Sequence, residues 1–188
     1  MPSLRPLPAL SDNYIWLLAD NAAGTAVVVD PGEASAVLDA LAVDGLTLTA
    51  ILLTHHHADH IGGASRLIEH FPEAVVYAPH DDRIPNVARR VGDGDSVTVA
   101  SPAARFQVME VHGHTRSHIA YYGEGLLFCG DTLFSLGCGR LFEGTPADML
   151  ASLDRLAALP GNTQVCCGHE STLANAAPPA SPRHARAA

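Results

Sequence analysis

Aromatic side chains and positive charge are both scarce in this chain of 188 residues. Phe, Trp and Tyr make up 5% of the chain whereas hydrophobic residues make up 47%, so we expect an aliphatic core. The 11 Lys and Arg residues are outnumbered by 20 Asp and Glu residues, which gives a formal net charge of -9. Because nucleic-acid binding depends on Lys and Arg meeting phosphates, this balance argues against a nucleic-acid partner.

Long hydrophobic runs and a paired cysteine framework are also missing. No apolar run approaches membrane-spanning length and the N-terminus has no secretory signal pattern, so we expect no membrane partner. The four cysteines are not spaced as in disulfide-rich secreted domains, which favours a cytoplasmic protein. The length suits one domain with a substantial core, which we expect to be monomeric.

Hydrophobic periodicity predicts strands and helices in a mixed order. Strands are expected at residues 13–19, 25–29, 49–53, 74–77, 105–111, 119–122, 126–129 and 163–167. Helices are expected at residues 33–43, 64–71 and 146–159, and the last of these has Pro at its start and Pro-Gly after its end. This order fits a layered α/β protein better than a helix bundle or a pure β-sandwich.

Five metal-capable side chains occupy six positions directly after the third predicted strand. His and Asp are seldom buried without partners, so their crowding at a strand end indicates a metal site. In extended backbone, residues two apart face the same way, so His55 and His57 can reach one ion while His56 points elsewhere. Asp59 and His60 follow the bend and can reach a second ion.

Further candidate ligands follow three other predicted strands, at His114, Asp131 and His169. Strand ends along one sheet edge are where α/β folds gather their sites. Two neighbouring ions need a bridging anion, for which Asp131 is best placed, and His114 and His169 are candidates for one further imidazole each. Nitrogen and carboxylate ligands suit zinc, and iron and manganese tolerate them. Such a two-metal centre activates water and polarises carbonyl groups, which favours hydrolysis.

The pattern His55-x-His57-x-Asp59-His60 resembles the H-x-H-x-D-H motif of the metallo-β-lactamase fold superfamily. The closer resemblance is to the glyoxalase II (hydroxyacylglutathione hydrolase) family, and it covers nearly all of the first 175 residues. The segments that carry it include Asn13-Tyr14-Ile15-Trp16, Val29-Asp30-Pro31-Gly32, Gly113-His114-Thr115, Gly130-Asp131-Thr132-Leu133-Phe134 and Cys167-Gly168-His169-Glu170. The segments that narrow it to glyoxalase II are Gly137-Cys138-Gly139-Arg140 and Phe142-Glu143-Gly144-Thr145.

This resemblance implies an αββα four-layer sandwich of the α/β (α+β) class, with two divalent metal ions, Zn²⁺ first and Fe or Mn as alternatives. The implied ligands are His55, His57 and His114 for the first metal, Asp59, His60 and His169 for the second, and Asp131 as the bridge. Asp59 and Asp131 are the implied catalytic residues because they would hold the bridging hydroxide. The implied reaction is hydrolysis of the thioester S-D-lactoylglutathione to D-lactate and glutathione, which serves methylglyoxal detoxification.

The same resemblance implies substrate contacts from Arg140, Phe142 and Ser171. Arg140 would bind a glutathione carboxylate, although it could also be an ordinary surface arginine. We expect Asp30 and His118 behind the metal ligands, where such residues orient imidazole rings. Asp30 could instead simply end a strand before Pro-Gly.

Three features depart from the family pattern. Residues 1–175 are expected to form the catalytic domain, and residues 176–188 an Ala/Pro-rich tail in place of the family's C-terminal helical domain. Ser171 stands where a tyrosine is usual, and Val111-His112 replaces Thr-Pro. Two alternatives stay open: a persulfide dioxygenase that uses a single iron, and a shortened homologue that binds metal but has little thioesterase activity.

Overall fold

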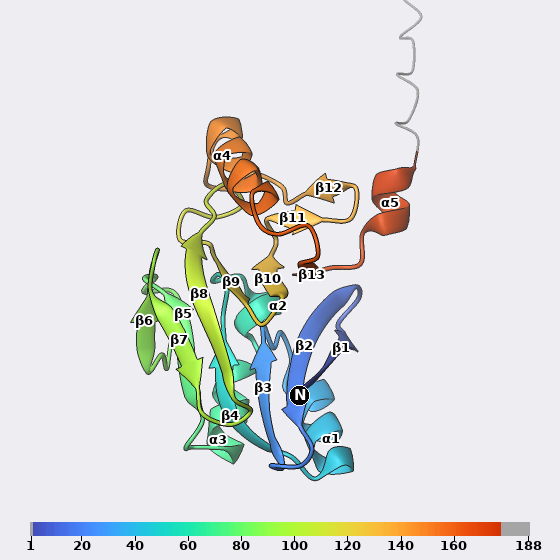
Figure 1. The fold of residues 1–188 in the computed structure, drawn as a ribbon, viewed down its shortest axis with the longest axis vertical. Helices are drawn as coiled ribbons and strands as arrows, with labels where there is room; N and C mark the ends of the chain where they lie inside the picture. Colours follow the sequence, from blue (N-terminus) through green and yellow to red (C-terminus); the bar gives the residue numbers. More distant parts are fainter. Residues whose placement is uncertain (1, 178–188) are drawn as a thin grey trace, which may run out of the picture.

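A computed structural model describes residues 2–177 of the chain (Figure 1). In this part of the chain the first sheet has the order β1-β2-β3-β4-β5-β6 and the second has the order β13-β10-β9-β8-β7. The strands of the first sheet are β1 (Ser3–Ala9), β2 (Asn13–Asp20), β3 (Thr25–Val29), β4 (Thr47–Leu52), β5 (Val75–Pro79) and β6 (Arg89–Val91). Those of the second are β7 (Ser96–Val99), β8 (Ala104–Glu110), β9 (Ile119–Gly123), β10 (Leu126–Gly130) and β13 (Gln164–Cys167).

Both sheets mix parallel and antiparallel neighbours. β1, β2 and β3 pair antiparallel, whereas β3, β4, β5 and β6 pair parallel. In the second sheet only the β10–β13 pair is parallel within the described residues. A short ribbon of β11 (Leu133–Phe134) and β12 (Gly137–Cys138) and the helices α1 (Ser35–Asp44), α2 (Ala58–Ile61), α3 (Ala64–His70), α4 (Pro146–Ala157) and α5 (Thr172–Ala176) complete these elements.

Successive side chains of a strand point to opposite faces of its sheet, and this alternation produces the layers. In β2, Ile15 and Leu17 pack with α1 and α3, whereas Leu18 joins a second cluster that contains Phe106 and Phe128 of the other sheet. A third cluster packs α4 on the outer face of the second sheet. Each fully buried aliphatic or aromatic side chain contributes roughly 1.5–3 kcal/mol. The order helix, sheet, sheet, helix confirms the predicted four-layer sandwich, and Figure 1 shows α1 and α3 at one end of the view and α4 at the other.

The sequence prediction missed some short elements. β1 carries Pro6 and Pro8, which lower strand propensity but are tolerated here because β1 is the edge of its sheet. β6 is only three residues long and lies outside the strands expected from periodicity, and the bend after His57 is the one-turn helix α2. α5 extends to Ala176, and residues 178–188 of the predicted tail lie outside the described residues. No helix in the described part is long and apolar enough to cross a membrane.

Candidate metal centre

The ends of β4, β8, β10 and β13 converge on one edge of the sandwich. His55 lies three residues after β4, His114 four residues after β8, Asp131 directly after β10 and His169 two residues after β13. The first sheet therefore delivers one group of side chains and the second sheet the other. This is the convergence that the strand order predicted, and the structure brings all seven predicted ligands together.

Glycine backbone holds the first ligand segment in place. α2 packs directly on the loop that follows β3, because a Cβ at Gly32 would lie 2.0 Å from the Asp59 carbonyl oxygen. On the other side of the centre, a Cβ at Gly168 would lie 2.5 Å from Asp131 Oδ1. A larger residue at Gly32 would push α2 away from this loop, and a larger residue at Gly168 would collide with the Asp131 side chain.

Cluster 1 consists of the imidazoles of His55, His57 and His114, whose candidate ligand atoms all lie within 4.8 Å of one another. His57 Nδ1 lies 3.1 Å from His55 Nε2 and 3.0 Å from His114 Nε2. The other ring nitrogens are held by neutral oxygens: His55 Nδ1 lies 3.0 Å from Thr54 Oγ1, and His114 Nδ1 lies 2.7 Å from the Arg140 carbonyl oxygen. These bonds direct both Nε2 atoms at one point.

Cluster 2 consists of Asp59, His60 and His169, within the same 4.8 Å limit. The Nε2 atoms of His60 and His169 are 3.3 Å apart, and Asp59 Oδ2 lies 3.5 and 3.4 Å from them. Carboxylates hold the outer ring nitrogens in this cluster. His60 Nδ1 lies 3.0 Å from Asp30 Oδ2, and His169 Nδ1 lies 3.0 Å from Asp12 Oδ1.

Asp131 lies between the two clusters. Its Oδ2 is 3.4 Å from His114 Nε2 and 3.3 Å from His169 Nε2, and its Oδ1 is 3.3 Å from His60 Nε2. Among residues 2–177, buried Oδ1 has no hydrogen-bond partner. An unpaired buried carboxylate oxygen is costly, and a cation beside it would remove that cost. The residues present therefore fit a pair of divalent cations.

Electrostatics support the same fit. Burial lowers the pKa values of His55, His57 and His114, which keeps these imidazoles neutral with lone pairs free. Burial also opposes protonation of His60 and His169, but neighbouring carboxylates, Asp131 first, raise their pKa values to about 10 and about 11. The carboxylates around cluster 2 thus favour positive charge at a buried position, which a divalent cation would supply in place of the protons.

His118 and Asp30 lie behind these clusters. His118 is fully buried, stacks on the His55 ring at 4.5 Å, and accepts a hydrogen bond of 3.1 Å from the Asp131 backbone N–H. Burial lowers its pKa to about 3, so the ring is a neutral acceptor. Asp30 Oδ2 accepts a 2.6 Å hydrogen bond from the Thr54 hydroxyl besides contacting His60, so it both fixes the strand end and orients a ligand.

His56 points away from the clusters, as strand alternation predicted. Its Nδ1 lies 3.4 Å from Asp81 Oδ2 and its Nε2 lies 3.6 Å from Glu143 Oε1. Both carboxylates also bind Arg83, at 2.8 and 2.5 Å. His56 therefore joins a network of charged side chains beside the centre and contributes no atom to either cluster.

Two of the three predicted substrate residues, Arg140 and Phe142, lie beside cluster 1. The Phe142 ring is 59% exposed and its centroid lies 5.5 Å from that of His57 and 5.3 Å from that of His114. The Arg140 guanidinium carbon lies 5.9 Å from the Phe142 ring centroid. Ser171 occupies the N-cap position of α5, without a capping hydrogen bond from its side chain, two residues beyond His169 of cluster 2.

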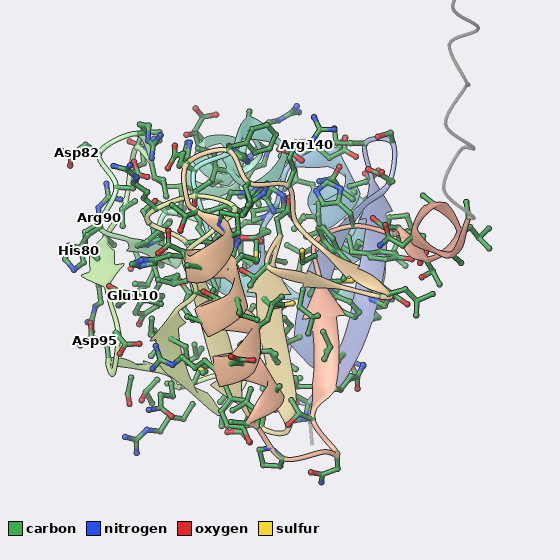
Figure 2. All side chains as sticks on the ribbon, turned by 90° about the horizontal axis from the view of Figure 1, so that it is seen from above. His80, Asp82, Arg90, Asp95, Glu110 and Arg140 are labelled. Carbon is green, nitrogen blue, oxygen red and sulfur yellow. The ribbon has the colours of Figure 1, made fainter. Side chains whose placement is uncertain are left out.

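His112, the histidine without a family counterpart, lies apart from the clusters. Its Nε2 lies 3.4 Å from Glu110 Oε2, and both residues line a separate cleft of about 420 Å³. Figure 2 shows Glu110 and His80, which line this cleft, well away from Arg140. His112 thus contributes no atom to the candidate metal centre within the described residues.

The sequence analysis did not identify two residues that form hydrogen bonds with the metal ligands. Asp12 reaches His169, and Asn13 Nδ2 donates a 3.1 Å hydrogen bond to Asp59 Oδ2. The backbone joins the same segments, because Tyr14 N–H donates to the Gly168 carbonyl oxygen at 2.8 Å. The available signal was the adjacent Asp-Asn pair at the start of a predicted strand. This pair does not reveal the residues that it contacts, which lie up to 157 positions away.

A model of the Metallo-beta-lactamase superfamily matches residues 10–169 of the chain. The chain belongs to this superfamily. Hydroxyacylglutathione hydrolases from Xanthomonas campestris pv. campestris (strain B100) and Xylella fastidiosa (strain M12) are each 60% identical to it, over 174 and 175 residues. The match covers 93% of this chain and 67% and 66% of those proteins, so the chain spans about two thirds of the length of these curated relatives. Within the superfamily it groups with the hydroxyacylglutathione hydrolases, as the sequence motifs predicted.

Solved structures of other superfamily members share the fold. ETHE1 from Myxococcus xanthus is 35% identical with a TM-score of 0.78, and the match covers 89% of this chain and 76% of that one. The BLEG-1 B3 metallo-beta-lactamase is 28% identical with a TM-score of 0.78, covering 89% and 92%. These two matches show that the fold is shared with proteins that are not named as hydroxyacylglutathione hydrolases.

Proposed function

We propose that the chain is a binuclear metal-dependent hydrolase of glutathione thioesters, which converts S-D-lactoylglutathione and water to D-lactate and glutathione. The observation that carries this proposal is the 60% identity to hydroxyacylglutathione hydrolases over 93% of the chain, together with two ligand clusters that share Asp131. Seven side chains would hold the metals: His55, His57 and His114 the first, Asp59, His60 and His169 the second, and Asp131 both. Zn²⁺ is the first candidate metal, with Fe or Mn as alternatives.

The bound cations would polarise the thioester carbonyl and make water nucleophilic near neutral pH. Asp59 and Asp131 are the residues we assign to this water, because their negative charge would hold the cations and their oxygens would accept its hydrogen bonds. Asn13 fixes the Asp59 carboxylate by donating a hydrogen bond to its Oδ2. The leaving group is a thiol of pKa about 8.5, so it departs as thiolate without a dedicated general acid.

Substrate contact is assigned to Arg140, Phe142 and Ser171. Arg140 is exposed, and its guanidinium has no carboxylate partner among residues 2–177, so it can pair with a carboxylate of glutathione. The Phe142 ring packs against the rings of His57 and His114 and would offer an apolar contact to the glutathione moiety beside the metal centre. Asp30 and His118 act as positioning residues for His60 and Asp131.

Turnover of S-D-lactoylglutathione by purified protein, with metal content measured on the same sample, tests the proposal. We expect two metal ions per chain and hydrolysis that a chelator abolishes. One iron per chain with oxygen consumption on glutathione persulfide would point instead to a persulfide dioxygenase. Two metals without turnover of any glutathione thioester would identify a metal-binding homologue and reject the hydrolase.

A further inference from the structure

The outer ring nitrogens of the ligand histidines have different partners in the two clusters. In cluster 1, a hydroxyl group holds His55 and a carbonyl group holds His114, and both are neutral. In cluster 2, the partners of His60 and His169 are the carboxylates of Asp30 and Asp12. A carboxylate behind a metal-binding imidazole fixes its rotation and tautomer and strengthens it as a ligand.

We propose that Asp12 is a positioning residue that sets the affinity of cluster 2 for its divalent cation without touching the cation. The inference rests on the metal centre of the proposed function but not on its substrate. Asp12 lies in the turn between β1 and β2, far in sequence from every ligand. Its carbonyl oxygen accepts a 2.8 Å hydrogen bond from the Glu170 N–H, and its Oδ1 lies 3.0 Å from His169 Nδ1.

These two contacts hold His169 from both sides. The backbone bond places the residue after His169, and the carboxylate sets the angle of the ring, so that Nε2 points to Asp131 Oδ2 at 3.3 Å. The hydroxyl of Ser11 lies 3.3 Å from the same Asp12 oxygen and steadies it. The β1–β2 turn thereby helps to position cluster 2, and among the described residues Asp12 makes no hydrogen bond or ion pair with a member of cluster 1.

Asp12 offers a cleaner test than Asp30. Asp30 is buried and also accepts hydrogen bonds from the Thr54 N–H and hydroxyl, so its replacement would disturb the backbone beside cluster 1. The Asp12 side chain is half-exposed, and Asp12→Asn keeps an oxygen acceptor while removing the charge. Glu33→Gln is the matched control. Glu33 and Asp12 line one cleft, and both substitutions remove one negative charge, but the Glu33 carboxylate accepts hydrogen bonds from the Leu10 N–H and the Ser35 hydroxyl and, within residues 2–177, has none to a metal ligand.

The experiment measures Zn²⁺ retained per chain across a series of chelator-buffered free Zn²⁺ concentrations at one pH, without substrate. For Asp12→Asn we expect one of the two equivalents to bind about 10- to 100-fold more weakly, with the other unchanged. Glu33→Gln should match the wild type. Co²⁺ loaded in place of Zn²⁺ should show the change in the absorption of one ion only, which a general loss of stability would not produce.

Several outcomes would overturn the inference. Unchanged retention in Asp12→Asn, equal weakening of both equivalents, or an equal effect of Glu33→Gln would each show that Asp12 does not act through His169. The metal-free melting temperature of each variant separates a folding defect from a ligand effect. Failure of the proposed function is distinguishable, because a wild-type chain that retains no Zn²⁺ removes the metal centre itself, whereas an inactive chain with two ions leaves the role of Asp12 standing.

Discussion

Side-chain direction separates ligand from neighbour within the run His55, His56 and His57. The outer two rings meet in cluster 1, and the middle one turns to Asp81 and Glu143. Chemically identical residues at adjacent positions therefore have different surroundings. This makes them matched probes of the centre, because each can be changed to alanine with the same loss of atoms.

We expect His57→Ala to lose one metal equivalent and to lower kcat/KM by more than about 100-fold. Substitution of a residue that only contacts a metal ligand already lowers metal affinity or activity by about 10- to 100-fold. His56→Ala should retain two equivalents, because no atom of His56 enters either cluster. Metal analysis and steady-state kinetics on both variants check this. Equal loss of metal from both variants would mean that either substitution disrupts the whole segment. Side-chain direction would then not determine which of these histidines binds metal.

Arg140→Ala should raise KM for S-D-lactoylglutathione by roughly 10- to 100-fold and leave kcat within a few-fold, because a charge-assisted hydrogen bond is worth about 1.5–3 kcal/mol. Arg66→Ala, on the exposed surface of α3, is the control. The kinetics should be measured with the metal centre fully loaded. An unchanged KM would make Arg140 a surface residue.

The ligand residues could be predicted from sequence, whereas their orienting partners could not. His55 and His57 fall within one short extended segment, where alternation alone decides direction, and Asp59 and His60 follow directly in α2. Asp12 and His169 are 157 positions apart and meet only because the β1–β2 turn crosses to the other sheet. A contact of that kind depends on how two sheets are placed, and no local periodicity reports it.

At the scale of elements, α4 is the helix whose start is specified most clearly by its local sequence. Thr145 Oγ1 accepts a hydrogen bond from the Asp148 N–H and the Asp148 carboxylate accepts one from the Thr145 N–H, which forms a capping box before Pro146. The predicted start of this helix was correct because proline and the cap are local signals. β1 was missed for the opposite reason, since its prolines are acceptable only at a sheet edge.

Thr145→Ala should destabilise the protein by about 1 kcal/mol, the usual cost of losing a threonine cap. Urea denaturation followed by circular dichroism would show a lower midpoint with an unchanged slope. Leu156 keeps the helix packed on the second sheet, so metal content should not change. A midpoint equal to that of the wild type would show that packing alone fixes the helix start.

Glu143 makes the loop before α4 sensitive to acid. The hydrogen bond from Arg83 is the main cause that lowers the Glu143 pKa to about 2 from its ordinary 4.5. A carboxylate whose folded pKa is depressed stabilises the fold above the unfolded pKa and loses that contribution as pH falls. The stability advantage of the wild type over Glu143→Gln should therefore be full above pH 4.5 and vanish toward pH 2.

Urea titrations of the two proteins at several pH values in this window would test the prediction. Solvent exposure of the pair limits the difference to a fraction of a kcal/mol. The equivalent comparison with Glu69→Gln, a carboxylate of α3 at the surface, should show no such pH dependence. A difference that stays constant from pH 6 to pH 2 would contradict the assignment to the Glu143 charge.

At the scale of the whole molecule, the metal centre joins the two sheets. His55, His57 and His60 follow β4 of the first sheet, whereas His114 and Asp131 follow strands of the second. Each cluster therefore draws ligands from both sheets, and a cation in either one crosslinks them at the edge of the sandwich. The layered core could be predicted from hydrophobic periodicity, but this crosslink follows only from the placement of the sheets.

Metal removal should accordingly lower the melting temperature as well as activity. A cation present at 100 times its dissociation constant stabilises the folded state by about 2.7 kcal/mol, and each kcal/mol shifts the melting temperature of a domain this size by roughly 2–4 °C. We therefore expect chelation to lower the melting temperature by roughly 5–10 °C for each cation lost. Without cations, Asp131 Oδ1 is again an unpaired buried oxygen, which adds to the effect.

Differential scanning calorimetry of the metal-loaded and metal-free protein would measure this shift. Zn²⁺ added back should restore the melting temperature, whereas Mg²⁺ should not, because imidazole-rich sites suit borderline metals and Mg²⁺ prefers oxygen ligands. His57→Ala should show a smaller shift than the wild type, since one cluster can no longer crosslink the sheets. A melting temperature that is the same with and without metal would mean that the ligands are held by the two sheets alone, with the cations adding chemistry but no stability.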